Sequence, residues 1–429
     1  MLGKSQFARL SLVCAATSIL TAPAAAQQLE EIVVTAQHRE QNIQDVPIAV
    51  TALGSADIDA AGIFDATTIA LNVPGMAYAE FSPGQAIISM RGITSVDDGA
   101  GLDNSVALFL DGVYIGRQAG IQFDMFDLER VEVLKGPQGT LFGRNAIGGA
   151  INVVTSKPQN EFGAKVQATV GNEGILRYQG LVTGGLTDNL SGKFVVNHRE
   201  HDGFTRNTLL QKDVQNEDYT SFRGQLMLET DATEWLLSAD LWDDDRDDMG
   251  RAPIANGNFD YVGTATDLGA GRPGTSASPT DGYTKREGSG LSLHGDIDLA
   301  GGVITSITGF RNTETDWEMP SIGAPAGGGY DLANGVFGVD VIDDIDEEID
   351  TFSQELRWTS SAEGSFDYIL GLYFLTEDTD REEQFRLDRN TVATGQVIVG
   401  NEYTRTRNET TSYAAYGQAN WRFSDAWTL

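Results

Sequence analysis

The sequence has 429 residues, 41% of them hydrophobic, and a formal net charge of −33 at pH 7. This excess of carboxylates excludes a protein that follows the phosphate backbone of nucleic acids, because such proteins present basic surfaces. The hydrophobic content is too high for a disordered polyanion, so the composition indicates a folded chain.

The first 26 residues have the three parts of a secretory signal peptide. Lys4 and Arg9 make a basic start, residues 10–20 form a short apolar stretch, and three alanines at 24–26 suit a cleavage site. The apolar stretch is too short for a spanning helix, and a buried N-terminal helix is the weaker alternative. Cys14, the only cysteine, would leave with the signal, so we expect an exported chain without disulfides or Cys-ligated metals.

Residues 31–36 read EIVVTA and are followed by a polar stretch at 37–45. Their β-branched residues favour an extended backbone. No other strand-forming sequence lies nearby, so we expect an extended, solvent-accessible segment, and the residues alone leave its partner open. The alternative is an edge strand of the domain that follows.

Residues 46–157 predict a compact α+β domain. The run at 45–62 indicates a strand and a short capped helix, and those at 106–116, 130–136 and 150–155 indicate further strands. The glycine-rich stretch at 128–158 could suggest a phosphate loop. However, it lacks the GxxxxGK[ST] pattern, and its lysine precedes its glycines, so we interpret these glycines as turn residues.

From about residue 158 onward, short segments alternate with period two, and we count about ten or eleven strands. In FSQELRW at 352–358, Phe352 and Leu356 share one face and Glu355 lies on the other, with Ser353 and Arg357. A soluble sandwich would also alternate. A barrel in lipid is favoured by aromatic residues near segment ends, charges on the polar face, and connections that alternate in length. The short ones are 187–189, 361–364 and 424–426, and the long ones are about 244–288, 318–349 and 380–403.

Two acidic runs, at 243–248 and 340–350, offer clustered oxygens of the kind that bind calcium. Neither has the spacing of a known calcium loop, and we expect solvated loops there. The four histidines are scattered, so we predict no metal site. No nucleophile elbow or catalytic triad pattern is present either, which predicts a protein that is not an enzyme.

Several of these segments together resemble the TonB-dependent receptors of Gram-negative outer membranes. They are the run at 128–158, MRGI at 90–93, FLDGVYIG at 109–116, FSQELRW and EIVVTA. The resemblance implies a transmembrane antiparallel β-barrel of about 22 strands with an N-terminal α+β plug domain inside it. The chain would hold only part of that barrel. The implied organisation is a signal peptide at 1–26, a TonB box and linker at 27–45, a plug at 46–157 and a partial barrel at 158–429.

The resemblance also implies a function. Such a receptor in the cell outer membrane takes up a scarce ligand, most often a ferric siderophore. The proton motive force drives uptake through TonB and its ExbB–ExbD motor complex. Receptors for a carbohydrate, an aromatic compound or cobalamin are alternatives, as is a passive or structural barrel protein. No cofactor is implied.

The resemblance assigns roles to three groups of residues. TonB binding falls on Glu31, Ile32, Val33, Val34, Thr35 and Ala36. The plug motif, structural or gating, comprises Arg91, Gly92, Asp111, Gly112, Arg130, Glu132, Lys135, Gly136, Arg144, Gly148 and Gly149. Plug arginines at 91, 130 and 144 are candidates to pair with barrel carboxylates, with Glu355 as a possible partner, although a role in a local turn is as plausible for each. Candidates beside the ligand route are Tyr261, Trp317 and Tyr330.

Overall fold

The computed structural model describes residues 33–428 except 36, 40, 64, 81–84, 97–98, 102, 118–125, 253–264, 321–325, 332–335, 362–364, 392–395 and 425–426. The side chains of 326–331, 336–340, 387–391, 396–399 and 428 also lie outside the description. The predicted signal peptide, Glu31, Ile32, Ala36 and Tyr261 therefore lie outside the described residues, as does the side chain of Tyr330.

The N-terminal domain is built on a mixed five-stranded sheet. Its order is β3 (Val50–Gly54), β9 (Leu128–Lys135), β10 (Gly149–Thr155), β7 (Val106–Leu110) and β8 (Val113–Ile115). Only the β10–β7 pair in this sheet is parallel. A second sheet contains β4 (Met76–Glu80), β5 (Ala86–Met90) and β6 (Ile93–Thr94). The predicted strands at 106–116, 130–136 and 150–155 are confirmed.

Three short helices accompany these sheets: α2 (Ser55–Ala61), α3 (Ala66–Asn72) and α4 (Gly139–Phe142). The Asp65 side chain caps α3 by accepting a hydrogen bond from Thr68 N at 2.7 Å. Ile58 of α2 and Ile69 of α3 are buried in the same apolar cluster as Val131 and Ile151 of the sheet. This burial supplies the main driving force for the domain.

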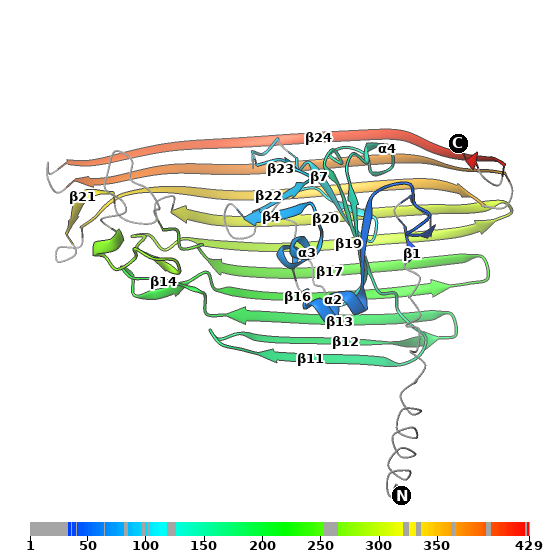
Figure 1. The fold of residues 1–429 in the computed structure, drawn as a ribbon, viewed down its shortest axis with the longest axis horizontal. Helices are drawn as coiled ribbons and strands as arrows, with labels where there is room; N and C mark the ends of the chain where they lie inside the picture. The colour runs from blue at the N-terminus through cyan, green and yellow to red at the C-terminus, as the bar shows by residue number, and fades with distance from the viewer. Residues whose placement is uncertain are drawn as a thin grey trace, which may run out of the picture.

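Most of the described residues after 162 form one large antiparallel sheet. Its strands in order are β11 (Gly163–Val170), β12 (Leu176–Thr187), β13 (Leu190–His201), β16 (Glu217–Glu229), β17 (Thr233–Asp247), β19 (Tyr283–Leu299), β20 (Gly302–Pro320), β22 (Val336–Ser360), β23 (Phe366–Thr391), β24 (Gln396–Ser424) and β25 (Trp427–Thr428). β21 (Ala326–Asp331) also pairs with β22. A separate small sheet contains β15 (Lys212–Val214), β14 (Thr205–Asn207) and β18 (Thr275–Ser276). β14 of this small sheet and β21 lie at one end of the large sheet, and tight turns and β1 lie at the other (Figure 1).

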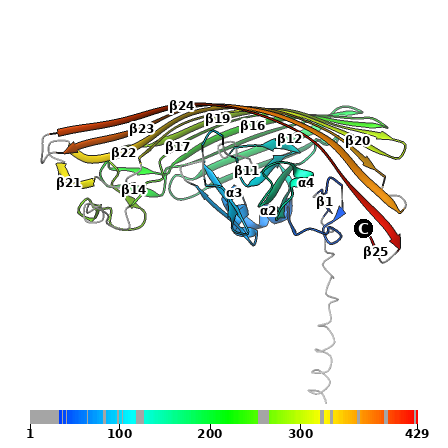
Figure 2. The ribbon, with the colours of Figure 1, turned by 90° about the horizontal axis from the view of Figure 1, so that it is seen from above.

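The large sheet curves around the N-terminal domain, which lies against its concave side (Figure 2). Its two faces differ in polarity, as the alternation predicts. Phe352 is 38% exposed and Leu356 48%, whereas Glu355 and Arg357 between and beside them are only 8% and 9% exposed. A broad exposed apolar face on a sheet with a polar inner face fits contact with lipid. The predicted fold, an antiparallel barrel sheet with an N-terminal α+β domain, is confirmed, and the barrel is incomplete. Among the described residues, no helix is long and apolar enough to cross a bilayer.

The prediction of solvated loops at the two acidic runs is wrong. Residues 243–247 continue β17, and residues 340–350 lie within β22. Ile345 and Ile349 are buried on the inner face, whereas Asp346 between them is exposed. Because the acidic residues alternate with inward apolar ones, the segment has the period of a strand in spite of its charge.

The turn between β7 and β8 fixes the N-terminal domain against the sheet. Asp111 and Gly112 both have positive φ, 49° and 82°, as this tight hairpin requires. The Asp111 carboxylate accepts hydrogen bonds from the backbone N and the hydroxyl of Thr155, at 2.8 Å and 2.9 Å. A Cβ at Gly112 would lie 2.9 Å from Cδ1 of Ile307 on β20. Backbone conformation and close contact therefore both require glycine here.

We expect Gly112→Ala to destabilise this hairpin by about 1–2 kcal/mol, because an L side chain resists positive φ. Amide hydrogen exchange at Val113–Ile115 should accelerate about tenfold or more. Gly139→Ala is the matched control, since no atom lies within 4 Å of a Cβ there and its φ is not positive. Equal exchange in both variants would contradict a role for this turn in seating the domain.

Candidate functional site

The segment after residue 32 is docked, although we expected it to be free. β1 (Val33–Val34) pairs antiparallel with β2 (Gln41–Asn42), and Val33 opposes Asn42. Val33 is 42% exposed, but Val34 is fully buried in an apolar cluster with Leu134 and Ala150 of the N-terminal domain. The extended backbone agrees with our expectation. The expected solvent access is wrong for Val34, because apolar burial against the domain outweighs exposure.

Thr35 attaches this segment to β9 of the N-terminal domain. Its backbone N and its hydroxyl both donate to Glu132 Oε1, at 2.8 Å and 3.0 Å. Glu132 is 0% exposed, and the same oxygen accepts from Arg130 Nε at 2.7 Å. Asn152 on β10 lies 3.5 Å from both the Thr35 hydroxyl and Glu132 Oε2. The buried carboxylate thus joins the segment to the middle of the small sheet.

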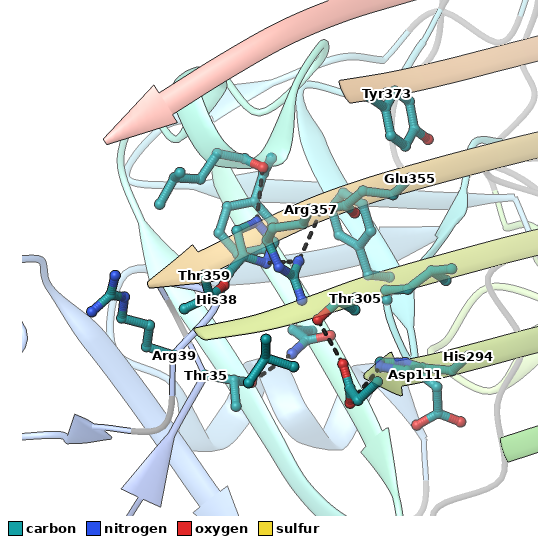
Figure 3. Close-up of a pocket in the computed structure, with 18 of the residues that line it drawn as sticks. Thr35, His38, Arg39, Asp111, His294, Thr305, Glu355, Arg357, Thr359 and Tyr373 are labelled. Carbon is teal, nitrogen blue, oxygen red and sulfur yellow. Dashed lines mark hydrogen bonds and ion pairs between the residues drawn. The ribbon is translucent and has the colours of Figure 1, made fainter. Parts of the chain in front are cut away.

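His38 joins the segment both to α4 and to the large sheet (Figure 3). Its Nε2 lies 3.0 Å from the carbonyl oxygen of Leu141, and its ring stacks on Phe142 with centroids 5.2 Å apart. Its Nδ1 lies 2.9 Å from Arg357 Nη1 on β22. Burial and the adjacent Arg357 lower the pKa of His38 below its ordinary value.

Arg39 adds a charged contact to the large sheet. Its Nη1 lies 2.8 Å from Asp367 Oδ1, and its Nη2 donates to the carbonyl oxygen of Tyr368 at 2.8 Å. Asp367 is 1% exposed and also pairs with Arg422 at 2.7 Å. The segment from Val33 to Arg39 therefore bridges the N-terminal domain and the large sheet.

A cavity of about 1130 Å³ lies beside this bridge, between the N-terminal domain and the large sheet. Thr35, Asp111, His294, Thr305 and Arg357 are among the residues that line it, and the close-up shows that they come from both parts of the molecule (Figure 3). The docked segment forms part of the cavity wall, so its release would change the boundary of this space.

The predicted pairing of domain arginines with sheet carboxylates is only partly reproduced. Arg144 reaches Glu377 of β23 at 3.7 Å and Asp103 of its own domain at 3.3 Å. Arg130 instead pairs with Glu129 and Glu132 of its own strand. The third arginine, at 91, occupies an exposed turn between β5 and β6 with a φ of 51°.

Glu355, our suggested partner for these arginines, pairs instead with Arg357 of its own strand at 2.8 Å and accepts a hydrogen bond from Tyr416. The suggestion is therefore wrong in this structure. Alternate residues of a strand share a face, so Arg357 lies closer to Glu355 than the arginines of the domain do.

Two contacts between the domain and the sheet escaped sequence analysis. Lys193 of β13 pairs with Asp127 at 2.7 Å, and both side chains are 1% exposed. Arg117 lies 3.4 Å from Glu377 and is also buried. A charged residue at an inward position of a strand, such as Lys193, indicates a contact with the enclosed domain. The sequence does not show which residue of that domain is the partner.

The remaining predicted motif residues are turn and strand positions. Gly92 follows β5, Lys135 ends β9, and Gly136, Gly148 and Gly149 border the loop that carries α4. Gly136 N donates to the carbonyl oxygen of Gly148 at 2.9 Å. Gly148 N donates to the carbonyl oxygen of Ser105 at 2.8 Å, so both of these backbone donors are paired within the domain.

Trp317, a candidate for the ligand route, is 0% exposed and packs with Met319 and Ile345 on the inner face of the large sheet. Its position beside the ligand route stays a prediction, as it does for the other two candidates. Within the described ranges, no group of three or more His, Cys, Asp or Glu side chains is placed to hold a metal ion.

Residues 42–150 match the family model of the TonB-dependent receptor plug domain. The vitamin B12 transporter BtuB of Photobacterium profundum is 27% identical over 252 residues, which cover 56% of this chain and 40% of that protein. The catecholate siderophore receptor Fiu of Escherichia coli K12 is 33% identical over 131 residues, 30% of this chain and 16% of that protein. The chain thus spans less than half the length of these relatives.

Two solved structures have the same fold. The ferric yersiniabactin uptake receptor FyuA of Yersinia pestis aligns over 89% of this chain and 63% of its own, with a TM-score of 0.62 and 17% identity. The ferripyoverdine receptor of Pseudomonas aeruginosa aligns over 92% of this chain and 52% of its own, with a TM-score of 0.68 and 16% identity.

Proposed function

We propose that the chain belongs to the TonB-dependent receptors and that its protein takes up a scarce ligand across the outer membrane with energy supplied through TonB. The proposed organisation is a signal at 1–26, a TonB box and linker at 27–45, a plug at 46–157 and barrel strands from 158. Homologous receptors are outer-membrane transport proteins rather than enzymes, which supports the same class for this chain.

The observation that carries the proposal is the attachment of Thr35 to Glu132. The proposed TonB box, Glu31 to Ala36, is joined at this residue to β9 in the interior of the plug sheet. A pull on the segment would therefore reach the small sheet directly. An extended segment can add as a strand to an exposed edge of TonB. About four to six main-chain hydrogen bonds, at roughly 1 kcal/mol net each and less the cost of ordering, suggest weak and reversible binding.

For the ligand we propose a ferric siderophore, because several relatives and structural neighbours are named as siderophore or iron-regulated receptors. Cobalamin is the second candidate, since the match to a vitamin B12 transporter is 252 residues long. Carbohydrate and aromatic-compound uptake remain alternatives without a specific observation in their favour.

Uptake by cells that produce the full-length receptor tests the proposal. Radiolabelled ferric siderophores of the catecholate and hydroxamate classes, and labelled cobalamin, are offered to cells with and without TonB. We expect one ligand class to accumulate only when both the receptor and TonB are present. Accumulation independent of TonB would indicate a passive barrel instead.

A further inference from the structure

We propose that His38 controls, by its protonation, the docking of the segment from Val33 to Arg39, which we call the coupling segment: its neutral ring holds the segment in the docked position, and its protonation releases it. This regulation rests on the proposed coupling role of the segment. The docking itself is a property of the receptor alone and can be measured without TonB.

The two hydrogen-bonding partners of His38 determine its protonation state. The Leu141 carbonyl oxygen, 3.0 Å from Nε2, can only accept, so Nε2 must carry the proton. Arg357 Nη1, 2.9 Å from Nδ1, can only donate, so Nδ1 must present its lone pair. Both contacts are satisfied by the neutral ring with its proton on Nε2. A doubly protonated ring would direct an N–H toward a guanidinium group.

Every element packed against His38 contributes to this balance. On β22, Arg357 opposes protonation and Glu355 favours it, and Tyr416 of β24 lies 6.2 Å away ring to ring while it donates to Glu355. On β9, Glu132 favours protonation, but it is already bonded to Thr35 and Arg130. Both carboxylates thus have other donors. The Leu141 carbonyl oxygen of α4 also favours the charged ring. Burial and Arg357 outweigh these three groups, and the pKa of the docked ring falls below its ordinary value.

The sign of the pH dependence follows from that direction. The free energy of docking is most favourable above the pKa of the released ring, about 6.5, because the neutral ring is then the main form in both states. Below that pH the released ring binds a proton that the docked ring resists, so docking weakens by up to tenfold per pH unit until the docked ring also titrates. Between pH 7.5 and 5.5 we expect the released fraction to rise about tenfold.

The buried position of Val34 provides a reporter. A cysteine placed there (Val34→Cys) should react with a thiol reagent only when the segment is released, because the native side chain is 0% exposed. The full-length receptor in detergent is labelled between pH 5 and 8. Asp188→Cys, in the exposed turn between β12 and β13, corrects for the pH dependence of the thiol itself. The corrected labelling rate should rise about tenfold from pH 7.5 to 5.5.

Two further variants, each combined with the reporter, separate the protonation of His38 from general loosening. His38→Gln keeps one acceptor and one donor but does not titrate, so labelling should stay slow and independent of pH. His38→Ala loses both contacts, so labelling should be fast at every pH. A wild-type rate that does not change with pH, or a His38→Gln variant that responds to acid as the wild type does, would overturn the proposal.

Discussion

Replacing Lys193 by methionine is expected to weaken the seating of the plug in the barrel by about 3–5 kcal/mol, because Asp127 is left as a buried and unpaired charge. The two charged groups lie 2.7 Å apart, and each side chain is 1% exposed. They join β13 of the barrel to the residue that precedes β9 in the plug. Amide exchange in β9 and β10 of the full-length receptor should accelerate by roughly two to three orders of magnitude.

The double variant Lys193→Met/Asp127→Asn should recover most of this loss, because Asn removes the unpaired buried charge and keeps an oxygen that accepts from the Ser156 hydroxyl, as Asp127 does at 2.6 Å. Lys165→Met is the matched control. Lys165 of β11 also joins barrel to plug, at 3.3 Å from Asp59 of α2, but these side chains are 46% and 62% exposed. Its loss should cost less than about 1 kcal/mol. Similar exchange in the two single variants would show that burial does not govern this contact.

Sequence periodicity was sufficient for the architecture wherever the polar and apolar faces were well separated. FSQELRW places Phe352 and Leu356 outward and Glu355 inward, as its pattern predicts. The same rule holds in the acidic part of β22, where we gave charge more weight than period. The apolar residues Ile345 and Ile349 keep the period of a strand within this acidic run. Because charge was given more weight than this period, the sequence analysis assigns to a loop a region that belongs to β22.

Sequence could not predict how the coupling segment docks. Arg39 and Asp367 are 328 positions apart in the chain, and their contact depends on the register of the barrel strands and the seat of the plug. A polar linker with no apolar period gives no indication of a packed position. His38 was therefore treated as a scattered histidine, although its ring is held between α4 and β22.

Replacing Val33 by proline is expected to abolish energised uptake, with a loss of roughly a hundredfold or more, while ligand binding stays intact. Proline removes a backbone donor and fixes φ, so this residue can no longer take part in a ladder of main-chain hydrogen bonds with TonB. Val33 is 42% exposed, and its strand β1 lies at the end of the large sheet that carries the tight turns. Binding and uptake of the labelled ligand are measured on the same cells.

Proline at this position also disturbs the native pairing of Val33 with Asn42, and a control must separate the two effects. Asn42→Pro disrupts the same β1–β2 pair from its other strand but leaves the proposed TonB box unchanged. Val33→Thr keeps both the β-branched shape and the backbone N–H. We expect near-normal uptake in both controls, because neither removes a donor that TonB would use. If Asn42→Pro abolished uptake as fully as Val33→Pro, the docked hairpin itself, and not strand addition by TonB, would be the element that transmits the pull.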